Sequence, residues 1–171
     1  RKLYAINPDG SLKWTYTTSG AILYSSPALG TDNDIYIGSN DNKLHSVNRS
    51  DGTERWKYPT SGDVRNSPAV TANGNIFFGS TDNKIYAVDL DGNSLPKWPI
   101  TVNGHVKGGI VFSDLDGNGE AEVIAATDMG DVVAFHLNGD PYPYFPIAND
   151  FPFSGAPMTT DLDNDGDLEI V

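Results

Sequence analysis

Two acidic segments carry the clearest chemical signal in the sequence. One runs from Asp114 to Glu122 and the other from Asp161 to Glu169, and both read D-x-D-x-[DN]-G-x-x-E. Oxygen-bearing side chains at alternate positions of a tight loop are the ligands that Ca²⁺ prefers. Glycine at position six permits the sharp turn that brings the chain back. We therefore predict one Ca²⁺ site in each loop.

Each position in these loops has an expected role. The side chains at positions one, three, five and nine would supply oxygen ligands, and position seven would supply its backbone carbonyl. The first site would then consist of Asp114, Asp116, Asn118, Glu120 and Glu122, and the second of Asp161, Asp163, Asp165, Asp167 and Glu169. The loops are shorter than an EF-hand, in which the closing acidic ligand comes at position 12.

Two alternatives to calcium stay open. Asp, Asn and Gly also form solvated turns without any metal, as the Thr31–Asp34 turn illustrates. Mg²⁺ prefers smaller octahedral sites that retain water. We favour Ca²⁺ because four or five carboxylates in one short loop would otherwise repel one another. Two such ions would bring the formal net charge from −12 to −8.

Acidic charge is concentrated in the second part of the chain. Residues 1–107 hold all 11 Lys and Arg against 10 acidic residues, whereas residues 108–171 hold 13 acidic residues and no Lys or Arg. Nucleic acid is a poor partner for such a chain, because phosphate binding needs a basic face. The absence of cysteine excludes a disulfide scaffold and a thiolate metal site. The apolar runs are too short for a membrane span.

The elements that must position the loops follow a repeat of about 41 residues. Each repeat contains four short apolar runs separated by turn residues, which predicts a four-stranded antiparallel sheet. Similar tetrapeptides begin 41 residues apart at Lys2, Lys43 and Lys84, and the aromatic residues that end each repeat are Trp14, Trp56, Trp98 and Phe145. Such sheets cover one another when they stack around an axis. The predicted fold is therefore an all-β β-propeller with blades of about 41–47 residues.

Residues 1–171 are predicted to form a single, partial propeller. Residues 22–58, 64–100 and 106–147 would be complete blades, and residues 2–17 and 154–171 would each supply two strands. We expect the Trp of each final strand to pack against the neighbouring blade. Because the chain begins and ends inside the repeat, we interpret it as a fragment of about four blades whose open edges would allow self-association. A closed four-bladed ring, or an eight-bladed ring from two copies, are the alternatives.

Residues 1–105 resemble the PQQ-like propeller repeats. The segment from Ser46 to Trp56, Ser46-x-Asn48-x-x-Asp51-Gly52-x-x-x-Trp56, is similar to their tryptophan-docking motif A-x-D-x-x-T-G-x-x-x-W. Quinoprotein dehydrogenases of this family bind a quinone with Ca²⁺ and often use a vicinal cysteine pair. This chain has no cysteine and matches none of their catalytic positions. The resemblance therefore implies a non-catalytic relative, like the propellers that act as assembly or binding scaffolds in the bacterial envelope.

Residues 106–171 resemble the FG-GAP or integrin-α-type propeller repeats. In those repeats D-x-D-x-D-G-x-x-D/E precedes an apolar strand, as the first acidic loop here precedes Val123-Ile124-Ala125. Glu replaces Asp at position nine of both loops, which gives that ligand a longer reach. The resemblance implies the same two Ca²⁺ sites.

These features predict a non-catalytic, calcium-binding scaffold that is extracellular, at the cell surface or periplasmic and that binds a protein or a polysaccharide. The alternative is the propeller domain of a secreted enzyme, a polysaccharide lyase or a quinoprotein oxidoreductase, whose catalytic residues lie outside this chain. We assign no catalytic and no cofactor-binding residue. His45, His105 and His136 lack metal-site spacing and are expected to pack or to lie at the surface.

Overall fold

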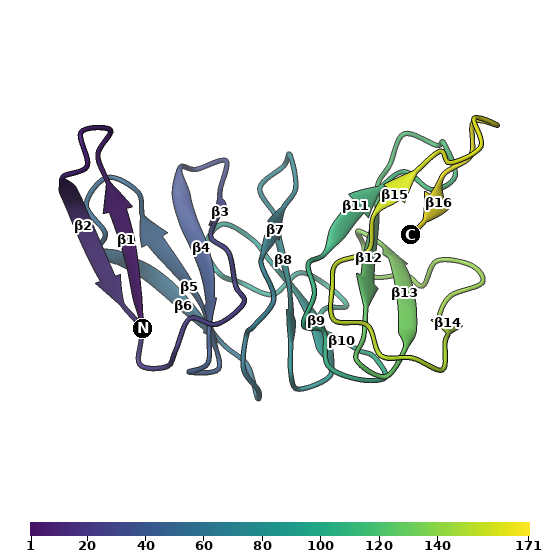
Figure 1. Ribbon diagram of the computed structural model, residues 1–171, viewed down its shortest axis with the longest axis horizontal. Helices are drawn as coiled ribbons and strands as arrows, with labels where there is room; N and C mark the ends of the chain where they lie inside the picture. Colours follow the sequence, from purple (N-terminus) through teal and green to yellow (C-terminus); the bar gives the residue numbers. More distant parts are fainter.

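The computed structural model describes residues 1–171, and all of its regular elements are β-strands. Sixteen strands form five antiparallel sheets that follow one another in chain order along the molecule (Figure 1). This arrangement confirms the predicted all-β propeller architecture of four-stranded blades. No helix in the structure is long and apolar enough to cross a membrane.

Three of the sheets are complete blades with their strands in sequential order. Blade 2 consists of β3 (Ala28–Leu29), β4 (Asp34–Ser39), β5 (Lys43–Asn48) and β6 (Glu54–Pro59). Blade 3 consists of β7 (Ala69–Val70), β8 (Ile76–Ser80), β9 (Lys84–Val88) and β10 (Ile100–Thr101). Blade 4 consists of β11 (Val111–Ser113), β12 (Glu122–Ala126), β13 (Asp131–His136) and β14 (Ile147–Ala148). Half-blade 1 pairs β1 (Lys2–Ile6) with β2 (Leu12–Thr17), and half-blade 5 pairs β15 (Thr159–Thr160) with β16 (Glu169–Ile170).

The first strands of blades 2 and 3 are shorter than the apolar pattern predicts. In blade 2 the apolar run from Ile22 to Leu29 forms a strand only over its last two residues. Upstream of β3 a side chain takes over the pairing, because the Gly38 N–H donates to Ser25 Oγ at 2.9 Å. Blade 3 uses Asn66 in the same way, with its Oδ1 accepting from the Gly79 N–H at 3.1 Å. In both blades a side-chain oxygen accepts the backbone N–H of the neighbouring strand, so that N–H does not need a backbone partner in a longer first strand.

The last strand is also short in blades 3 and 4. Trp98 and Phe145 lie just before β10 and β14, whereas Trp14 and Trp56 lie within β2 and β6. Proline has no N–H to give to a strand ladder. Prolines stand two residues before and one residue after each of the displaced aromatic residues, at Pro96, Pro99, Pro143 and Pro146. The prediction that every repeat places its aromatic residue in the final strand is therefore wrong for these two repeats.

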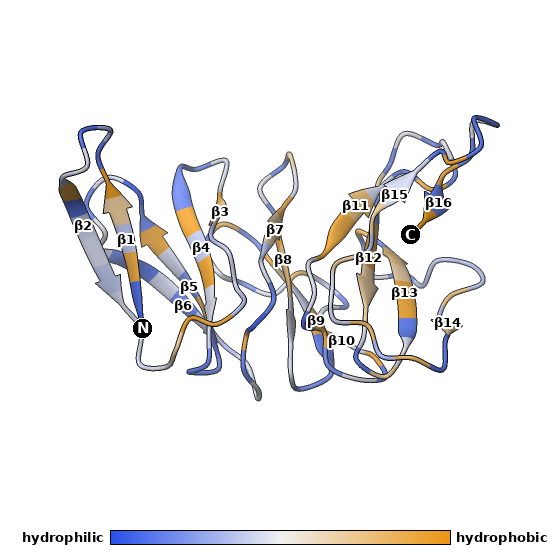
Figure 2. Ribbon diagram, in the orientation of Figure 1, coloured by the Kyte–Doolittle hydropathy of each residue, from blue (hydrophilic) through white to orange (hydrophobic).

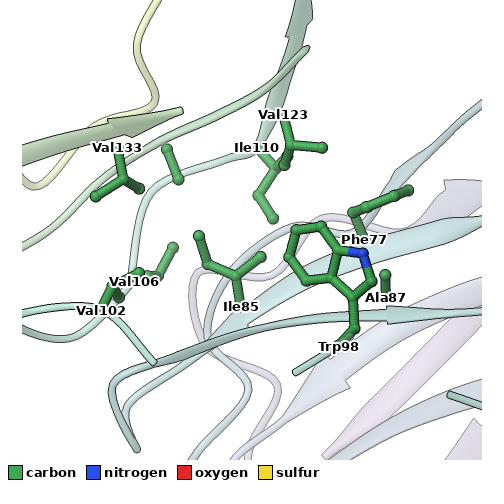
Figure 3. Close-up of a cluster of buried hydrophobic side chains, with 10 residues drawn as sticks. Phe77, Ile85, Ala87, Trp98, Val102, Val106, Ile110, Val123 and Val133 are labelled. Carbon is green, nitrogen blue, oxygen red and sulfur yellow. The ribbon is translucent and has the colours of Figure 1, made fainter. Parts of the chain in front are cut away.

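The hydrophobic core lies between blades rather than inside any one of them. Strands such as β4, β11 and β13 contain hydrophobic segments, while the loop between β15 and β16 is largely hydrophilic (Figure 2). Burying one large apolar side chain contributes roughly 1.5–3 kcal/mol. The largest cluster joins blades 3 and 4 (Figure 3) and consists of Phe77, Ile85, Ala87, Trp98, Val102, Val106, Ile110, Val123, Ala125 and Val133. No blade buries its own faces, so adjacent blades must fold together.

Each tryptophan docks onto a turn of the following blade. The indole N–H of Trp14 donates to the Arg49 carbonyl at 2.9 Å, and that of Trp56 donates to the Leu90 carbonyl at 2.8 Å. The indole of Trp98 reaches the Leu137 carbonyl at 3.2 Å. Buried indole N–H groups need such acceptors. The predicted packing of each Trp against its neighbouring blade is thus confirmed.

Candidate metal centres

The two acidic loops occupy equivalent places in adjacent sheets. The first connects β11 to β12, and the second connects β15 to β16, so each loop joins the first two strands of its blade. The residue at position nine begins the second of these strands in both cases, as Glu122 in β12 and Glu169 in β16. Strand pairing on both sides of each loop therefore fixes the distance between its first and last acidic residues.

Three carboxylates converge in each loop. Ligand atoms of Asp114, Asp116 and Glu122 all lie within 4.8 Å of one another. Those of Asp161, Asp163 and Glu169 meet the same limit in the second loop. The predicted residues at positions one, three and nine are thus brought together twice, by the same local fold.

The backbone conformation of the two loops is also the same. Position six, which the sequence pattern reserves for glycine, has a φ of +89° at Gly119 and +98° at Gly166. Position four is left-handed too, with a φ of +69° at Gly117 and +61° at Asn164. Gly and Asn are the residues that tolerate this conformation best. The left-handed conformation at position four was not predicted, although Gly117 and Asn164 are residue types that signal it.

Loop N–H groups hold the converging carboxylates in place. Asp114 accepts from the N–H of Asn118 at 3.0 Å and from that of Gly119 at 2.8 Å. In the second loop Asp161 accepts from the Gly166 N–H at 3.1 Å. The position-nine carboxylate accepts from the N–H of position two in both loops, at 2.9 Å from Leu115 and 2.8 Å from Leu162. A carboxylate oxygen has more than one lone pair, so these bonds leave capacity for a cation.

The position-five side chain of each loop also forms a hydrogen bond within the turn, and the ligand roles predicted for positions five and seven stay predictions. The Asn118 amide oxygen accepts from the Glu120 N–H at 2.7 Å, and Asp165 accepts from the Asp167 N–H at 2.9 Å. The carboxylates of Glu120, Asp165 and Asp167 lie outside the two clusters. At position five the side chain therefore supports the turn, in addition to any role as a ligand.

The first cluster is anchored by a buried carboxylate that contacts a histidine. Glu122 is fully buried and lies opposite His136 in the register of β12 and β13. His136 Nδ1 is 3.2 Å from Glu122 Oε1. His136 lacks metal-site spacing in the sequence and is 14 residues from Glu122, and only the strand register brings the pair together.

Negative charge dominates the surroundings of the first loop. Loss of hydration together with the charges of Asp116, Glu122 and Asp114 raises the pKa of the Tyr142 hydroxyl. In the second loop Asp161 Oδ1 is buried and has no hydrogen-bond partner. An uncompensated buried carboxylate oxygen is costly unless a cation or a donor faces it. Each loop thus holds negative charge that the protein itself does not compensate.

The sequence of residues 1–140 matches the family model described as outer membrane protein assembly factor BamB. The chain belongs to this family. The BamB match extends beyond residue 105 and includes the first acidic loop. The predicted division of the chain at residue 105 stays a prediction, as does the FG-GAP character of the part that follows.

A BamB structure from Moraxella catarrhalis has the same fold. It superposes with a TM-score of 0.68 at 17% sequence identity, over 91% of this chain and 49% of that one. The chain thus spans about half the length of that BamB. The search of curated proteins found no match. At this identity the likeness establishes the propeller fold and assigns no binding residue.

Proposed function

We propose that this chain is part of a non-catalytic, calcium-stabilised propeller scaffold of the cell envelope, periplasmic or attached to the outer membrane, that binds a protein partner. Membership of a family described as an outer membrane assembly factor supports the location and the kind of partner. Assembly factors act by binding proteins, which favours a protein over a polysaccharide. The likeness of residues 106–171 to calcium-loop propeller repeats is part of the same proposal.

One observation carries the calcium part of this proposal: two loops in adjacent sheets bring the same three carboxylates within 4.8 Å. Ca²⁺ accepts about six to eight oxygen ligands in a flexible geometry, whereas Mg²⁺ demands near-ideal octahedral geometry and keeps several waters. A short loop that brings three carboxylates together therefore suits Ca²⁺ better. Asp114, Asp116 and Glu122 would hold the first ion, and Asp161, Asp163 and Glu169 the second.

A bound cation would act on the fold rather than on a substrate. It would offset the mutual repulsion of the carboxylates and hold the end of one strand to the start of the next through Glu122 and Glu169. A ligand that binds only the folded state raises the unfolding free energy by mass action. The expected role of calcium is thus to make half-blade 5 and blade 4 rigid enough to present a binding surface.

The test is calcium titration by calorimetry on chelator-stripped protein, with thermal unfolding measured in parallel. We expect two binding events and a Tm that rises with calcium concentration. Asp116→Asn and Asp163→Asn should each abolish one event. Asp91→Asn is the matched control, because Asp91 also precedes a turn glycine and is exposed, but belongs to neither cluster.

The outcome separates the two parts of the proposal. If wild-type protein binds no calcium and its Tm ignores a chelator, the calcium part is wrong and the loops are solvated turns. Loss of binding in Asp91→Asn as well would show that the titration reports overall charge and not the two sites. The scaffold part depends on the family and would be tested separately by capture of envelope proteins from the source organism.

A further inference from the structure

A buried histidine joins half-blade 1 to blade 2. His45 lies on β5, and only 2% of its surface is exposed. Its Nδ1 is 2.8 Å from the Tyr16 hydroxyl on β2, and its Nε2 is 3.0 Å from Asp41 Oδ1 in the turn between β4 and β5. The same Tyr16 hydroxyl donates to Glu54 Oε2 on β6 at 2.7 Å. A chain of three hydrogen bonds therefore crosses the junction between the two sheets.

The number of protons in this chain depends on the charge of the ring. Each of the three contacts needs one hydrogen, and the carboxylates of Asp41 and Glu54 can only accept when they are ionised. Tyr16 has a single hydroxyl hydrogen, which it gives to Glu54. Both ring nitrogens of His45 must then donate, to Asp41 and to Tyr16. A neutral ring carries one N–H and leaves one contact without a hydrogen.

The neighbouring groups keep the other charges fixed. Burial opposes ionisation of Asp41, but the hydrogen bond and charge of His45 outweigh it and lower the Asp41 pKa. Burial is likewise outweighed at Glu54, whose pKa is lowered by Lys57 and by the Tyr16 hydroxyl. Loss of hydration and the nearby Glu54 raise the pKa of Tyr16, so its hydroxyl stays protonated.

The remaining groups around the ring are two lysines with partners of their own and an apolar side chain. Lys57, opposite His45 in the strand register, pairs with Glu54 at 2.9 Å. Lys43 donates to the Asp41 carbonyl at 3.1 Å. Ile37, the partner of His45 on β4, is apolar and fully buried. His45 is thus the one side chain in the network that can exist with either one or two ring hydrogens.

We propose that His45 is a doubly protonated, buried ring that latches half-blade 1 onto blade 2, and that this junction loosens as the pH rises and the ring loses one proton. The direction of this pH effect follows from the number of hydrogens that the ring carries. All three hydrogen bonds form when both ring nitrogens carry hydrogens, which is the acidic side of the histidine range. On the alkaline side either the Tyr16–Glu54 bond or the Tyr16–His45 bond is lost.

The next junction in the chain lacks this switch and serves as the comparison. Tyr86 stands on β9 where His45 stands on β5, 41 residues earlier, and donates its hydroxyl to Asp82 at 2.6 Å. Tyr58, the counterpart of Tyr16, bonds Ser94 at 2.7 Å. Neither contact needs a group that titrates near neutral pH. The substitution His45→Tyr therefore copies a junction that already exists in this protein.

The direct test is the protonation state of the ring in the wild-type protein. Long-range ¹H–¹⁵N spectra resolve the two ring nitrogens, and the His45 signals are those missing in His45→Tyr. At pH 6.5, where a free histidine is about half protonated, we expect both nitrogens of His45 to carry hydrogens. Signals of a half-neutral or neutral ring at this pH would overturn the proposal.

The second test is the pH dependence of thermal stability. Between pH 5.5 and pH 8 the Tm of the wild type should fall by about 2–4 °C more than that of His45→Tyr, the effect of losing roughly one hydrogen bond in a chain of this size. His105 and His136 are present in both proteins, so any contribution from them cancels in the comparison. An equal fall in both proteins, or a larger one in the variant, would contradict the latch.

Discussion

Glycine recurs at one turn position of successive repeats, but the structural reasons that require it differ from repeat to repeat. Gly10 and Gly52 both have a left-handed backbone, with φ of +84° and +76°. A Cβ at Gly10 would meet nothing within 4 Å, whereas one at Gly52 would lie 2.7 Å from the ring of Trp14. Gly52 is therefore required twice, by its own φ and by the indole of the preceding repeat. Gly92 receives Trp56 in the same way, with an approach of 2.9 Å.

This difference predicts two unequal substitutions. Gly10→Ala should cost about 1–2 kcal/mol, the strain of a left-handed non-glycine residue. Gly52→Ala should cost a further 1–3 kcal/mol, roughly, because the indole must move. Urea unfolding of both variants measures the two losses, and since the backbone strain is common to them, their difference reports the docking of Trp14. Equal losses of unfolding free energy in the two variants would mean that the Trp14 indole can move aside without destabilising the fold.

Part of the candidate site could be predicted at the residue scale. The D-x-D-x-[DN]-G-x-x-E pattern identified the three carboxylates that converge, because their spacing is set within one loop. The left-handed residue at position four could have been found from Gly117 and Asn164. The contact of His136 with Glu122 could not, because it depends on the pairing of β12 with β13. The acidic pattern also gave no sign that Asp165 would turn toward the Asp167 N–H.

At the scale of elements, one aspartate in each complete blade ties the preceding linker to a hairpin. Asp41, Asp82 and Asp128 follow the second strand of their blades. Each accepts a backbone N–H from the linker that enters the blade, at 3.0 Å from Ser19, 2.9 Å from Ser61 and 2.7 Å from His105. These aspartates recur with the repeat, yet their partners are about 20 residues away. Periodicity reveals such residues and does not say what they bind.

The tether in blade 4 should make stability depend on acid. Burial opposes ionisation of Asp128, but its bonds with Lys107 and with the His105 N–H outweigh burial and lower the pKa. A lowered folded-state pKa contributes stability above the unfolded value of about 3.9, and this is lost as the pH falls through the folded value. Asp128→Asn should cost about 1 kcal/mol at pH 6. The gap between wild type and variant should close toward pH 3, and a gap that stays constant would show that charge is not the cause.

Strand prediction succeeded where a strand is paired on both sides. The central strands β4, β5, β8 and β9 each contain β-branched or aromatic residues and appear close to where the apolar runs predict them. The first strands β3 and β7 are shortened because the Ser25 and Asn66 side chains accept the Gly38 and Gly79 N–H groups of the neighbouring strands instead. A side chain that replaces a backbone hydrogen-bond partner does not change the hydrophobic periodicity of the sequence. The ends of β3 and β7 therefore could not be predicted.

At the scale of the whole molecule, charge is divided unevenly between its two parts. Residues 108–171 hold 13 acidic residues without a Lys or Arg, while the rest of the chain is nearly balanced. Like charges this close destabilise the compact state, and salt screens them. If calcium binds the two loops, salt and calcium should both weaken the repulsion among the acidic side chains of residues 108–171.

The expected result is a salt dependence that calcium weakens. With a chelator present, raising NaCl from low to about 0.5 M should raise the Tm, because the Debye length falls to about 4 Å and the repulsion among the acidic side chains is screened. With saturating calcium the same increase should have a smaller effect. Thermal unfolding at matched ionic strength gives both curves. Identical salt dependence with and without calcium would argue that the ions do not neutralise these loops.

The docking of each tryptophan also bears on how chains of this kind can change length. The indole comes from one repeat and the glycine turn that receives it from the next, as Trp14 with Gly52 and Trp56 with Gly92 show. Any segment of about 41 residues therefore contains one docking residue and one receiving turn, wherever it starts. If such a segment is duplicated or deleted, each docking tryptophan still has a glycine turn that receives it. Propellers with different numbers of blades can arise in single genetic steps without a new interface having to evolve.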